Sequence, residues 1–538
     1  MEDIFIIGNG LAGMSAALTL VQLGKHATVV SVCEPCRSQS VLAEGGINAS
    51  LNTKNQNDSA ALHAEDTLKA GCYLADPKAV ERLTTAAPGI VKSLARKGVV
   101  FSRDENGNIN LRYFGGQKKM RTAFSKSGIG KQLVTGLSLH FYKYISEGKI
   151  TFLKGNRFLS PVISDSGRCI GVILEDIATL EKTIHPASAV IAASGGLGNL
   201  FSSHTGALTN DAGVSASLFS HGVRMANLEM IQYHPTTIQS LSKCILISES
   251  ARGEGGRLFT FKDGKRWYFM EELYPEGGNL MPRDVVSRTI HRICTEEGLG
   301  IEGKYQVGLQ LEHLDKDILN DNLKEVCETA KTYLGIDPAK DYIPVSPGIH
   351  YFMGGIYVDY LHRTTMPGIY AAGECACQYH GANRLGGNST LGAIFGGQTA
   401  AETAAGEATS PDVMLVERCG QKELEKMGKL TEKPSAAQMM SLHHIMDACL
   451  GVSRCEEKLS AGLQAVTELK AGADGIFLEK LHLAEAMVKS ALARKESRGA
   501  QYRSDYPDTS DEFLKVTVSA YGSSGVTVSF DEIGRVFE

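Results

Sequence analysis

Long apolar segments are missing from this sequence of 538 residues. No stretch approaches the roughly 20 consecutive apolar residues that a membrane-spanning helix needs, so we expect no direct membrane insertion. The first residues, MEDIFIIGNG, lack the basic region, long apolar region and small-residue cleavage site of a secretory signal peptide. We therefore expect a cytoplasmic protein, free or held at the inner face of the membrane by partner subunits.

A strong imbalance of charge is also absent. Lys+Arg number 55 and Asp+Glu 60, and no run of basic residues forms a stripe, so no nucleic-acid partner is expected. The 12 cysteines are scattered without the spacing of an iron–sulfur cluster, and we predict no metal site and reduced thiols. Cys33 and Cys36 have CxxC spacing. A redox pair and two coincidental loop thiols both remain open, and the lack of a thioredoxin-like context favours the second.

Glycine, in contrast, is abundant, with 58 residues gathered in short motifs. The share is about 11%, against a typical usage of about 7%. The first motif joins a strand expected at Asp3–Gly8 to a helix expected at Leu11–Leu23, and a second strand is expected at Ala27–Val32. These three segments form a βαβ unit of the usual length.

The motif itself, Gly8-Asn9-Gly10-Leu11-Ala12-Gly13, has the GxGxxG spacing of a dinucleotide site. The three glycines allow, in order, a tight turn, approach of the backbone to a pyrophosphate, and close helix–strand packing. An acid usually ends the second strand, but here that strand ends in Val30-Ser31-Val32. Glu34 comes too late in the chain, so Ser31 is the candidate for the contact on the adenosine side.

Two later apolar runs, Ala189–Ala193 and Gly368–Ala372, read as strands of the same sheet. Their distance along the chain indicates an inserted domain, and helical periodicity dominates after about residue 410. An alternating segment, Phe513–Phe530, predicts a terminal hairpin. The predicted division is 1–225 with 346–410 as a discontinuous dinucleotide-binding domain, 226–345 as the inserted domain, 411–505 as a helical domain and 506–538 as a C-terminal tail.

A series of polar motifs follows in the rest of the chain. They are Arg37-Ser38-Gln39-Ser40, Ala43-Glu44-Gly45-Gly46-Ile47-Asn48, His234-Pro235-Thr236, Ser248-Glu249-Ser250-Ala251-Arg252-Gly253-Glu254-Gly255-Gly256, Pro282-Arg283-Asp284-Val285-Val286-Ser287-Arg288, His350-Tyr351-Phe352-Met353-Gly354-Gly355, Gly373-Glu374-Cys375-Ala376, His380-Gly381-Ala382-Asn383-Arg384-Leu385-Gly386-Gly387-Asn388-Ser389 and Glu496-Ser497-Arg498-Gly499. In this order, over about residues 4–510, the sequence resembles the flavoprotein subunits of succinate dehydrogenase and fumarate reductase. L-Aspartate oxidase belongs to the same superfamily and shares most of these motifs.

The resemblance implies an α/β fold: a Rossmann-type FAD-binding domain, an inserted α+β capping domain and a C-terminal helical domain. It implies FAD as the cofactor, with Glu374 on a flavin ribose and Ser389 beside the flavin at a helix start. The full set of expected FAD contacts is Gly8, Gly10, Leu11, Ala12, Gly13, Ser31, Ser38, Gln39, Ser40, Gly45, Gly46, Ser194, Gly195, Asp211, Glu374, Arg384, Ser389 and Leu391.

The resemblance also implies a C4 dicarboxylate substrate, with a hydride passing between flavin N5 and one alkene carbon. Arg283 resembles the family's residue for proton transfer, and Glu249 with Arg252 resembles its proton relay. The spacing of Glu249 and Arg252 puts them on one helical face. The expected substrate ligands are His234, Thr236, Ser248, His350 and Arg384, with Phe114 as a wall of the site.

Two departures from the family pattern bear on function. Membrane-bound members carry a histidine that bonds covalently to the flavin where this chain has Gln39, so we predict dissociable FAD and a bias towards fumarate reduction. Aspartate oxidases carry an acid where this chain has Phe114, and an aromatic side chain favours a substrate without an ammonium group.

The leading hypothesis is the flavoprotein subunit of a fumarate reductase that receives electrons from an iron–sulfur partner. L-Aspartate oxidase, a reductase of another unsaturated acid and a non-enzymatic electron relay remain as alternatives. We expect the inserted domain to close over the site as a lid.

Overall fold

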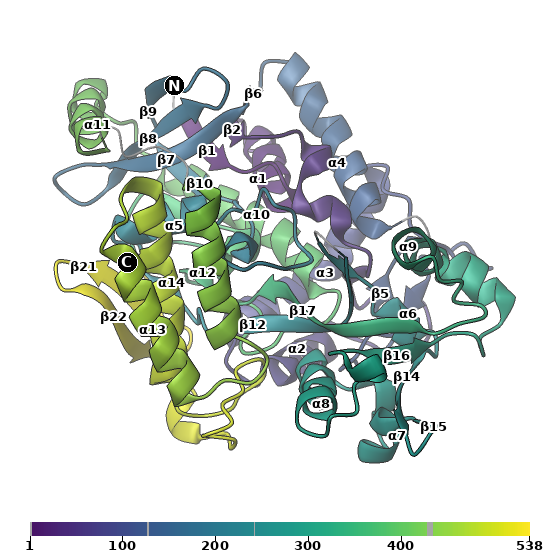
Figure 1. The fold of residues 1–538 in the computed structure, drawn as a ribbon. Helices are drawn as coiled ribbons and strands as arrows, with labels where there is room; N and C mark the ends of the chain where they lie inside the picture. The colour runs from purple at the N-terminus through teal and green to yellow at the C-terminus, as the bar shows by residue number, and fades with distance from the viewer. Residues whose placement is uncertain (1–2, 126–127, 241–242, 428–433, 538) are drawn as a thin grey trace.

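A parallel β-sheet forms the centre of the computed structural model, which describes residues 3–125, 128–240, 243–427 and 434–537 (Figure 1). All four of its strand pairings are parallel. In spatial order the strands are β19 (Ile369–Ala371), β10 (Ala189–Ala192), β1 (Asp3–Ile7), β2 (His26–Ser31) and β6 (Ile150–Lys154). The predicted Rossmann-type arrangement is confirmed, with the second strand beginning and ending one residue earlier than expected.

Different elements pack against the two faces of this sheet. Alternate side chains of each strand point to opposite faces, so each strand contributes to both contacts. Ile4 and Ile6 pack with helices on one face, and Phe5 and Ile7 pack on the other face against the sheet β7–β8–β9 and helix α5. The helices of the first face are α1 (Leu11–Gln22), α3 (Pro77–Arg96), α4 (Ile129–Ser146) and α10 (Asn388–Glu407). The elements of the second face are β7 (Asn156–Ile163), β8 (Cys169–Asp176), β9 (Lys182–Pro186) and α5 (Gly213–Ser220).

A six-stranded antiparallel sheet occupies much of the segment between β10 and β19. Its strands, in spatial order, are β13 (Cys244–Leu246), β12 (Ile231–Gln239), β17 (Ile343–Phe352), β16 (Val307–Gln310), β14 (Arg257–Lys262) and β15 (Lys265–Trp267). Around it lie α6 (Ser250–Gly253), α7 (Phe269–Leu273), α8 (Arg283–Thr295) and α9 (Lys324–Leu334), in teal and green in Figure 1. Strand β17 runs across the boundary proposed at residues 345 and 346, so the domain limits remain a proposal.

Helices dominate the chain after α10, as the sequence predicts. They are α11 (Val413–Met427), α12 (Ala436–Cys449), α13 (Glu456–Lys470) and α14 (Gly475–Ala493). The terminal hairpin is also present, as β21 (Val516–Gly522) and β22 (Gly525–Asp531). The hairpin is part of a larger sheet and is not a free tail. Strand β21 pairs with β11 (Met225–Ala226), which pairs with β18 (Gly355–Tyr357), and β18 pairs with β20 (Ala376–Cys377).

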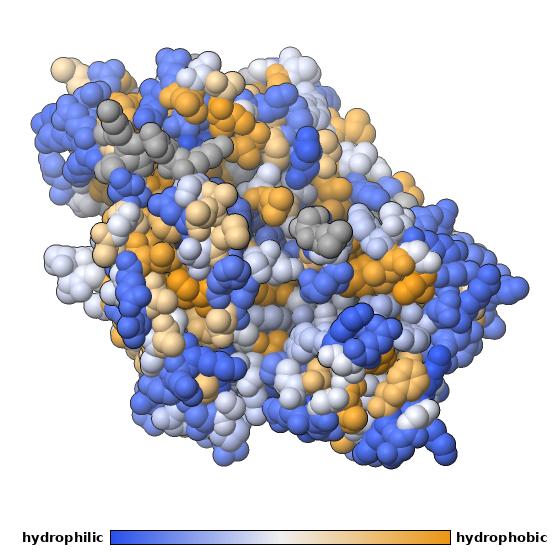
Figure 2. All heavy atoms as spheres, in the orientation of Figure 1, coloured by the Kyte–Doolittle hydropathy of each residue, from blue (hydrophilic) through white to orange (hydrophobic). Residues whose placement is uncertain are grey.

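One further helix and a small three-stranded sheet come from the segment between β2 and α4. They are α2 (Ala60–Ala70) and the small sheet β3 (Ile47–Asn48), β5 (Thr122–Ala123) and β4 (Leu111–Arg112). No helix in the described ranges combines the length and apolar character needed to cross a bilayer, and no cluster of metal-ligating side chains occurs within them. All cysteines, Cys33 and Cys36 included, are free thiols. On the face shown in Figure 2, hydrophilic residues gather over the edge that carries α9.

Candidate active site

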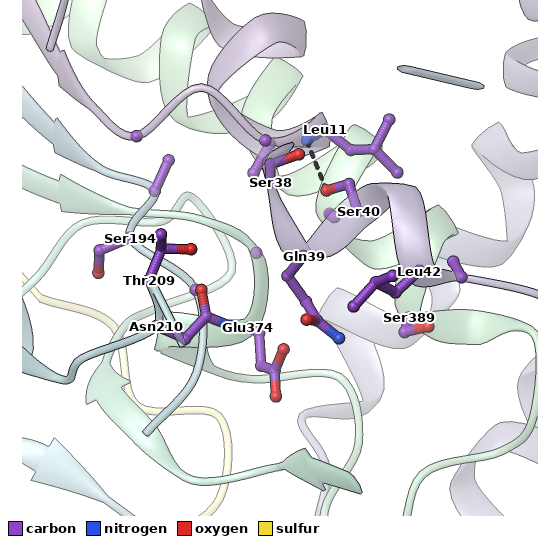
Figure 3. A pocket seen from close by; sticks show the side chains of 18 of the residues that line it. Leu11, Ser38, Gln39, Ser40, Leu42, Ser194, Thr209, Asn210, Glu374 and Ser389 are labelled. Atoms are coloured by element: carbon purple, nitrogen blue, oxygen red, sulfur yellow. Dashed lines mark hydrogen bonds between the residues drawn. The ribbon is translucent and has the colours of Figure 1, made fainter. Parts of the chain in front are cut away.

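A cavity of about 430 Å³ opens at the carboxyl ends of β1, β2, β10 and β19. Parallel sheets characteristically bind ligands at this edge, because loops of different strands meet there. The cavity continues to the edge of the six-stranded sheet, where His234, Ser248 and His350 line it. Of the predicted site residues, all but Gly13, Thr236, Arg252 and Leu391 line this one cavity. Figure 3 shows part of its wall.

The glycine motif has the geometry expected of a dinucleotide site. A Cβ at Gly8 would lie 2.2 Å from the Ala193 carbonyl oxygen, and a Cβ at Gly13 would lie 1.9 Å from the Gly8 carbonyl oxygen. Gly13 therefore acts in helix–strand packing rather than at the cavity wall. Helix α1 begins at Gly10 without a side-chain cap, which leaves its first N–H groups directed at the cavity. One of them, from Leu11, donates to Ser40 Oγ at 3.0 Å (Figure 3).

The end of β2 lies at the same cavity without an acid. Ser31 lines the wall, whereas Glu34 turns to the surface, where Lys154 Nζ lies 2.8 Å from Glu34 Oε1 and the Tyr142 hydroxyl donates to Oε2 at 2.5 Å. The hydrogen bond and charge of Lys154 lower the pKa of the Glu34 carboxyl. The structure thus favours Ser31 over Glu34 as the residue near a bound nucleotide.

Gln39 projects into the space that Glu374 and Ser389 also face (Figure 3). Its side-chain oxygen accepts a hydrogen bond from the Ala207 backbone N–H, which fixes the amide. Ser389 is not an N-cap, because α10 begins at Asn388 after Gly387, so it lies within the first turn. That position still places its hydroxyl at the positive end of the helix dipole. Leu391, two residues further along α10, is fully buried in the core cluster that contains side chains of α1, and it does not line the cavity.

Glu374 lies in a short turn after β19 and caps no long helix. Its Oε1 accepts a hydrogen bond from the Phe352 backbone N–H at 3.1 Å. Burial raises the pKa of the carboxyl to about 7, against the lowering effect of that N–H group and of Arg384. A buried carboxylate is stabilised by hydrogen-bond donors, so a hydroxyl group of a bound ligand would be a suitable partner for Glu374.

Arg283, the first residue of α8, is held from three sides. Its Nε and one terminal nitrogen donate to Glu249 Oε2 at 2.9 and 2.6 Å, and the other terminal nitrogen donates to Gln232 Oε1 at 3.0 Å. Each terminal nitrogen carries a second N–H that is not used in these bonds. Gln232 is a residue of this site that the sequence did not indicate, since a lone glutamine within a strand carries no motif.

Glu249 and Arg252, the residues predicted to form a relay, continue a chain of contacts that starts at Arg283. Glu249 occupies the N-cap position of the short helix α6 without a capping hydrogen bond from its side chain. Arg252, three residues on, places a terminal nitrogen 3.5 Å from Glu249 Oε1. The Gly115 backbone N–H donates to the same oxygen at 3.0 Å. Burial would raise the pKa of Glu249, but Arg283 and Arg252 outweigh it and the pKa is lowered. Arg252 lies behind Glu249 and off the cavity wall.

Two neutral histidines face the cavity side by side, with ring centroids 5.1 Å apart. Burial and the charge of Arg283 lower the pKa of His234 and of His350 well below the ordinary value. The ring nitrogen Nδ1 of His350 is oriented by the Thr205 hydroxyl at 2.8 Å, a partner that the sequence did not reveal. His234 Nε2 is buried without a hydrogen-bond partner among the described residues.

Thr236 contributes differently from the prediction. Its hydroxyl donates to the Ile247 carbonyl oxygen at 2.9 Å, and its backbone lies against His234 Nδ1. Thr236 therefore orients the imidazole, while Ser248 and not Thr236 lines the cavity.

Arg384 and Phe114 complete the wall. The Arg384 guanidinium lies 4.4 Å from the centroid of the Tyr351 ring, and its Nε is buried without a partner in the described part of the chain. Burial and the neighbouring charge of Arg283 lower its pKa to about 9. Phe114 is 2% exposed and packs its ring against Gly45 and Gly386. Three guanidinium groups and one carboxylate leave this cluster positively charged, which suits a ligand with two carboxylates.

The residues present fit FAD. The glycine turn and open helix start suit a pyrophosphate, Glu374 suits a hydroxyl group, and the α10 N-terminus suits the negative charge of a reduced flavin. The orphaned donors of His234 and Arg384 lie beyond this region, at the edge of the six-stranded sheet.

Comparison with known proteins gives consistent matches. The FAD binding domain family matches residues 3–390, and the fumarate reductase flavoprotein C-terminal family matches residues 477–534. The succinate dehydrogenase flavoprotein subunit of Bacillus subtilis is 37% identical over 97% of this chain and 94% of its own length. The 8-methylmenaquinol:fumarate reductase flavoprotein subunit of Wolinella succinogenes is 35% identical over 97% and 89%. A structure of quinol fumarate reductase from E. coli superposes with a TM-score of 0.90 at 28% identity, covering 100% of this chain and 98% of that chain.

Proposed function

We propose that this chain, which belongs to the family of succinate dehydrogenase and fumarate reductase flavoproteins and is an FAD-dependent oxidoreductase, reduces fumarate to succinate. The observation that carries the proposal is the position of Arg283. It lines the cavity while Glu249 and Gln232 fix its guanidinium plane, and Arg384 and the free nitrogen of His234 line the same cavity.

The same cluster supports a substrate with two carboxylates. Arg384 Nε is buried without a hydrogen-bond partner among the described residues, and the charge of Glu374 only partly offsets the lowering of the Arg384 pKa. An incoming carboxylate would therefore satisfy a buried cation. His234 Nε2 and the His350 ring supply neutral groups for hydrogen bonds with the other carboxylate. Phe114 offers no partner for an ammonium group, which supports fumarate over an amino acid.

Arg283 is proposed to deliver the proton. When bound, FAD would supply the two-electron chemistry, as the source of the hydride for one alkene carbon. Arg283 would donate a proton to the other carbon. Glu249, which is ionised and accepts two N–H groups of Arg283, would take up a proton from the side of Arg252 and pass it on to Arg283. Arg252 lies behind Glu249 and extends the path away from the cavity.

The direction of the reaction is proposed from Gln39. Its amide provides no nucleophile for a covalent flavin bond, and its oxygen is committed to the Ala207 N–H group. FAD is then dissociable, and the bias towards fumarate reduction expected from the family follows.

Electrons are proposed to come from an iron–sulfur partner subunit. The relatives named above are flavoprotein subunits, and two of them belong to complexes named for a quinol donor. A partner of this kind would also hold the chain at the inner face of the membrane.

A paired anaerobic assay on the FAD-loaded chain tests this function. Reoxidation of the dithionite-reduced flavin by fumarate, with no bleaching of oxidised flavin by L-aspartate, is the expected result. Bleaching by L-aspartate would instead identify an L-aspartate oxidase. Reoxidation by crotonate at least as fast as by fumarate would identify a reductase of another unsaturated acid. If none of fumarate, L-aspartate and crotonate reacts with the flavin, the chain would be identified as a non-enzymatic electron relay.

A further inference from the structure

The nucleotide end of the cavity lacks the acid that usually ends the second strand of a Rossmann unit. Strand β2 ends at Ser31, and Val32 follows. The cavity wall is instead reached by a carboxylate from far along the chain, Glu479 of helix α14, together with Ile476. Both residues lie well beyond residue 390, where the match to the FAD binding domain family ends.

A chain of contacts places Glu479 at the nucleotide end. The Ser31 carbonyl oxygen accepts a hydrogen bond from the Gly155 N–H at 2.8 Å, and residues 156–159 of β7 then line the cavity. The Ser217 hydroxyl of α5 donates to the Leu159 carbonyl oxygen at 2.7 Å, and the same serine lies beside Glu479. Helix α14 packs along α5, as Figure 1 shows.

The surroundings of Glu479 are apolar on several sides. Phe158, Leu159, Val214 and Ile476 line the cavity with it, and Ile476 packs against the core cluster that contains Leu159. Such a slot suits the flat faces of a purine ring. A carboxylate at its edge is costly to bury without a donor.

The basic side chains of His221 and Lys480 have other partners. His221 Nε2 lies 2.9 Å from Glu423, and Lys480 Nζ donates to the Asp211 carbonyl oxygen at 2.5 Å. Burial raises the pKa of Glu479 to about 7, with the His221 charge lowering it and the Glu423 charge raising it. The carboxyl group has a hydrogen bond with the Ser217 side chain, but a carboxylate has further acceptor positions, and Glu479 lines the cavity, so it can accept a hydrogen bond from a ligand there.

We propose that Glu479 accepts a hydrogen bond from the exocyclic amine of the adenine ring of FAD, so that α14 belongs to the cofactor site. The usual acid at the end of the second strand would bind the ribose, and β2 lacks it. Glu479, from the C-terminal region, would instead supply a carboxylate to the adenine ring. This inference concerns cofactor recognition and holds for either direction of catalysis.

The test compares FAD with flavin hypoxanthine dinucleotide, in which a carbonyl oxygen replaces the exocyclic amine. Binding to the deflavinated full chain is followed by quenching of flavin fluorescence. The wild-type protein should bind FAD about tenfold more tightly, the difference of one hydrogen bond to a carboxylate. Glu479→Gln should lose most of this preference, because an amide can accept from the amine or donate to the carbonyl oxygen. Glu479→Ala should bind both dinucleotides equally and weakly.

Glu423→Gln is the matched control, because Glu423 lies beside the same histidine but off the cavity wall. It should keep the wild-type preference, and FMN binding should be the same in all four proteins. Glu479→Gln is isosteric, and thermal unfolding of each deflavinated protein checks that it folds. Equal binding of the two dinucleotides by the wild type, or a preference that survives in both Glu479 variants, would overturn the proposal.

Discussion

Arg283 and Glu249 are joined by two hydrogen bonds that converge on one carboxylate oxygen. Nε and a terminal nitrogen of Arg283 lie 2.9 and 2.6 Å from Glu249 Oε2, while Oε1 of Glu249 takes the Gly115 N–H and faces Arg252. The Glu249 carboxylate thus lies between the Arg283 guanidinium, which lines the cavity, and the Arg252 guanidinium, which lies behind it. The pair connects α8 to α6.

Replacing Arg283 by lysine should abolish most turnover while FAD stays bound. Lysine keeps the charge but cannot reach Glu249 and Gln232 with the same planar group, so proton delivery fails. We expect fumarate reduction to fall by about 10²–10⁴-fold, the usual contribution of a positioned acid. Turnover with a dye donor and the flavin-to-protein ratio measure the two effects.

The control is Arg292→Lys, on the exposed side of the same helix. It should leave both quantities unchanged. Wild-type turnover in Arg283→Lys would show that another group supplies the proton.

Replacing His234 by alanine should weaken dicarboxylate binding more than it slows chemistry. The lost donor is a buried, neutral nitrogen without a protein partner, so its hydrogen bond to substrate is made without breaking another. One such bond contributes about 1–1.5 kcal/mol, which corresponds to roughly tenfold in KM. Thr205→Val should give a smaller rise through misorientation of His350. An unchanged KM in His234→Ala would remove this residue from the substrate site.

FAD should leave the protein on acid precipitation, because Gln39 cannot bond covalently to it. The yellow colour is expected in the supernatant, and the pellet should be colourless and non-fluorescent on a denaturing gel. A fluorescent protein band would show a covalent flavin held by another side chain.

The affinity for FAD should fall as the pH drops below about 7. Glu374 has a raised pKa of about 7 in the cofactor-free protein, so it is protonated below this value and ionised above it. If the ionised carboxylate accepts a cofactor hydroxyl group, binding requires loss of that proton, and affinity is gained as pH rises through 7. Fluorescence titrations from pH 5.5 to 8.5 give the dependence.

The slope of log Kd against pH gives the number of protons released when FAD binds. In Glu374→Gln this number should be smaller by about one. The slope that remains belongs to other groups, Glu479 among them. Glu417→Gln, an exposed change on α11, should keep the wild-type slope. An unaltered slope in Glu374→Gln would show that the carboxyl does not meet the cofactor in its ionised form.

The region around the six-stranded sheet should rotate towards the parallel sheet when a dicarboxylate binds. His234 and Arg283 come from this region, whereas Arg384 comes from the loop before α10, so a ligand that contacts all three pulls the two parts together. Crystal structures with and without malonate would measure the rotation. The same relative position in both would argue against a lid.

The sequence predicted the central architecture because local signals there were strong. The βαβ unit at β1, α1 and β2, the helix α13 and the terminal hairpin were each specified by periodicity and turn residues within a short window. Arg283 and His234 were named on a different basis, the resemblance of their motifs to a known family. The small differences at helix and strand ends, and Ser389 within the helix instead of before it, reflect capping geometry that a sequence specifies weakly.

The tertiary structure alone decided which of these residues meet. Gln232 and Thr205 join the site through strand pairing and loop contacts, and Thr236 turns its hydroxyl to Ile247 and away from the cavity. Glu479 reaches the nucleotide end only because α14 packs on α5, more than 250 positions earlier in the chain. Each of these contacts depends on long-range packing of buried surfaces, and such packing leaves no pattern at fixed spacing in the sequence.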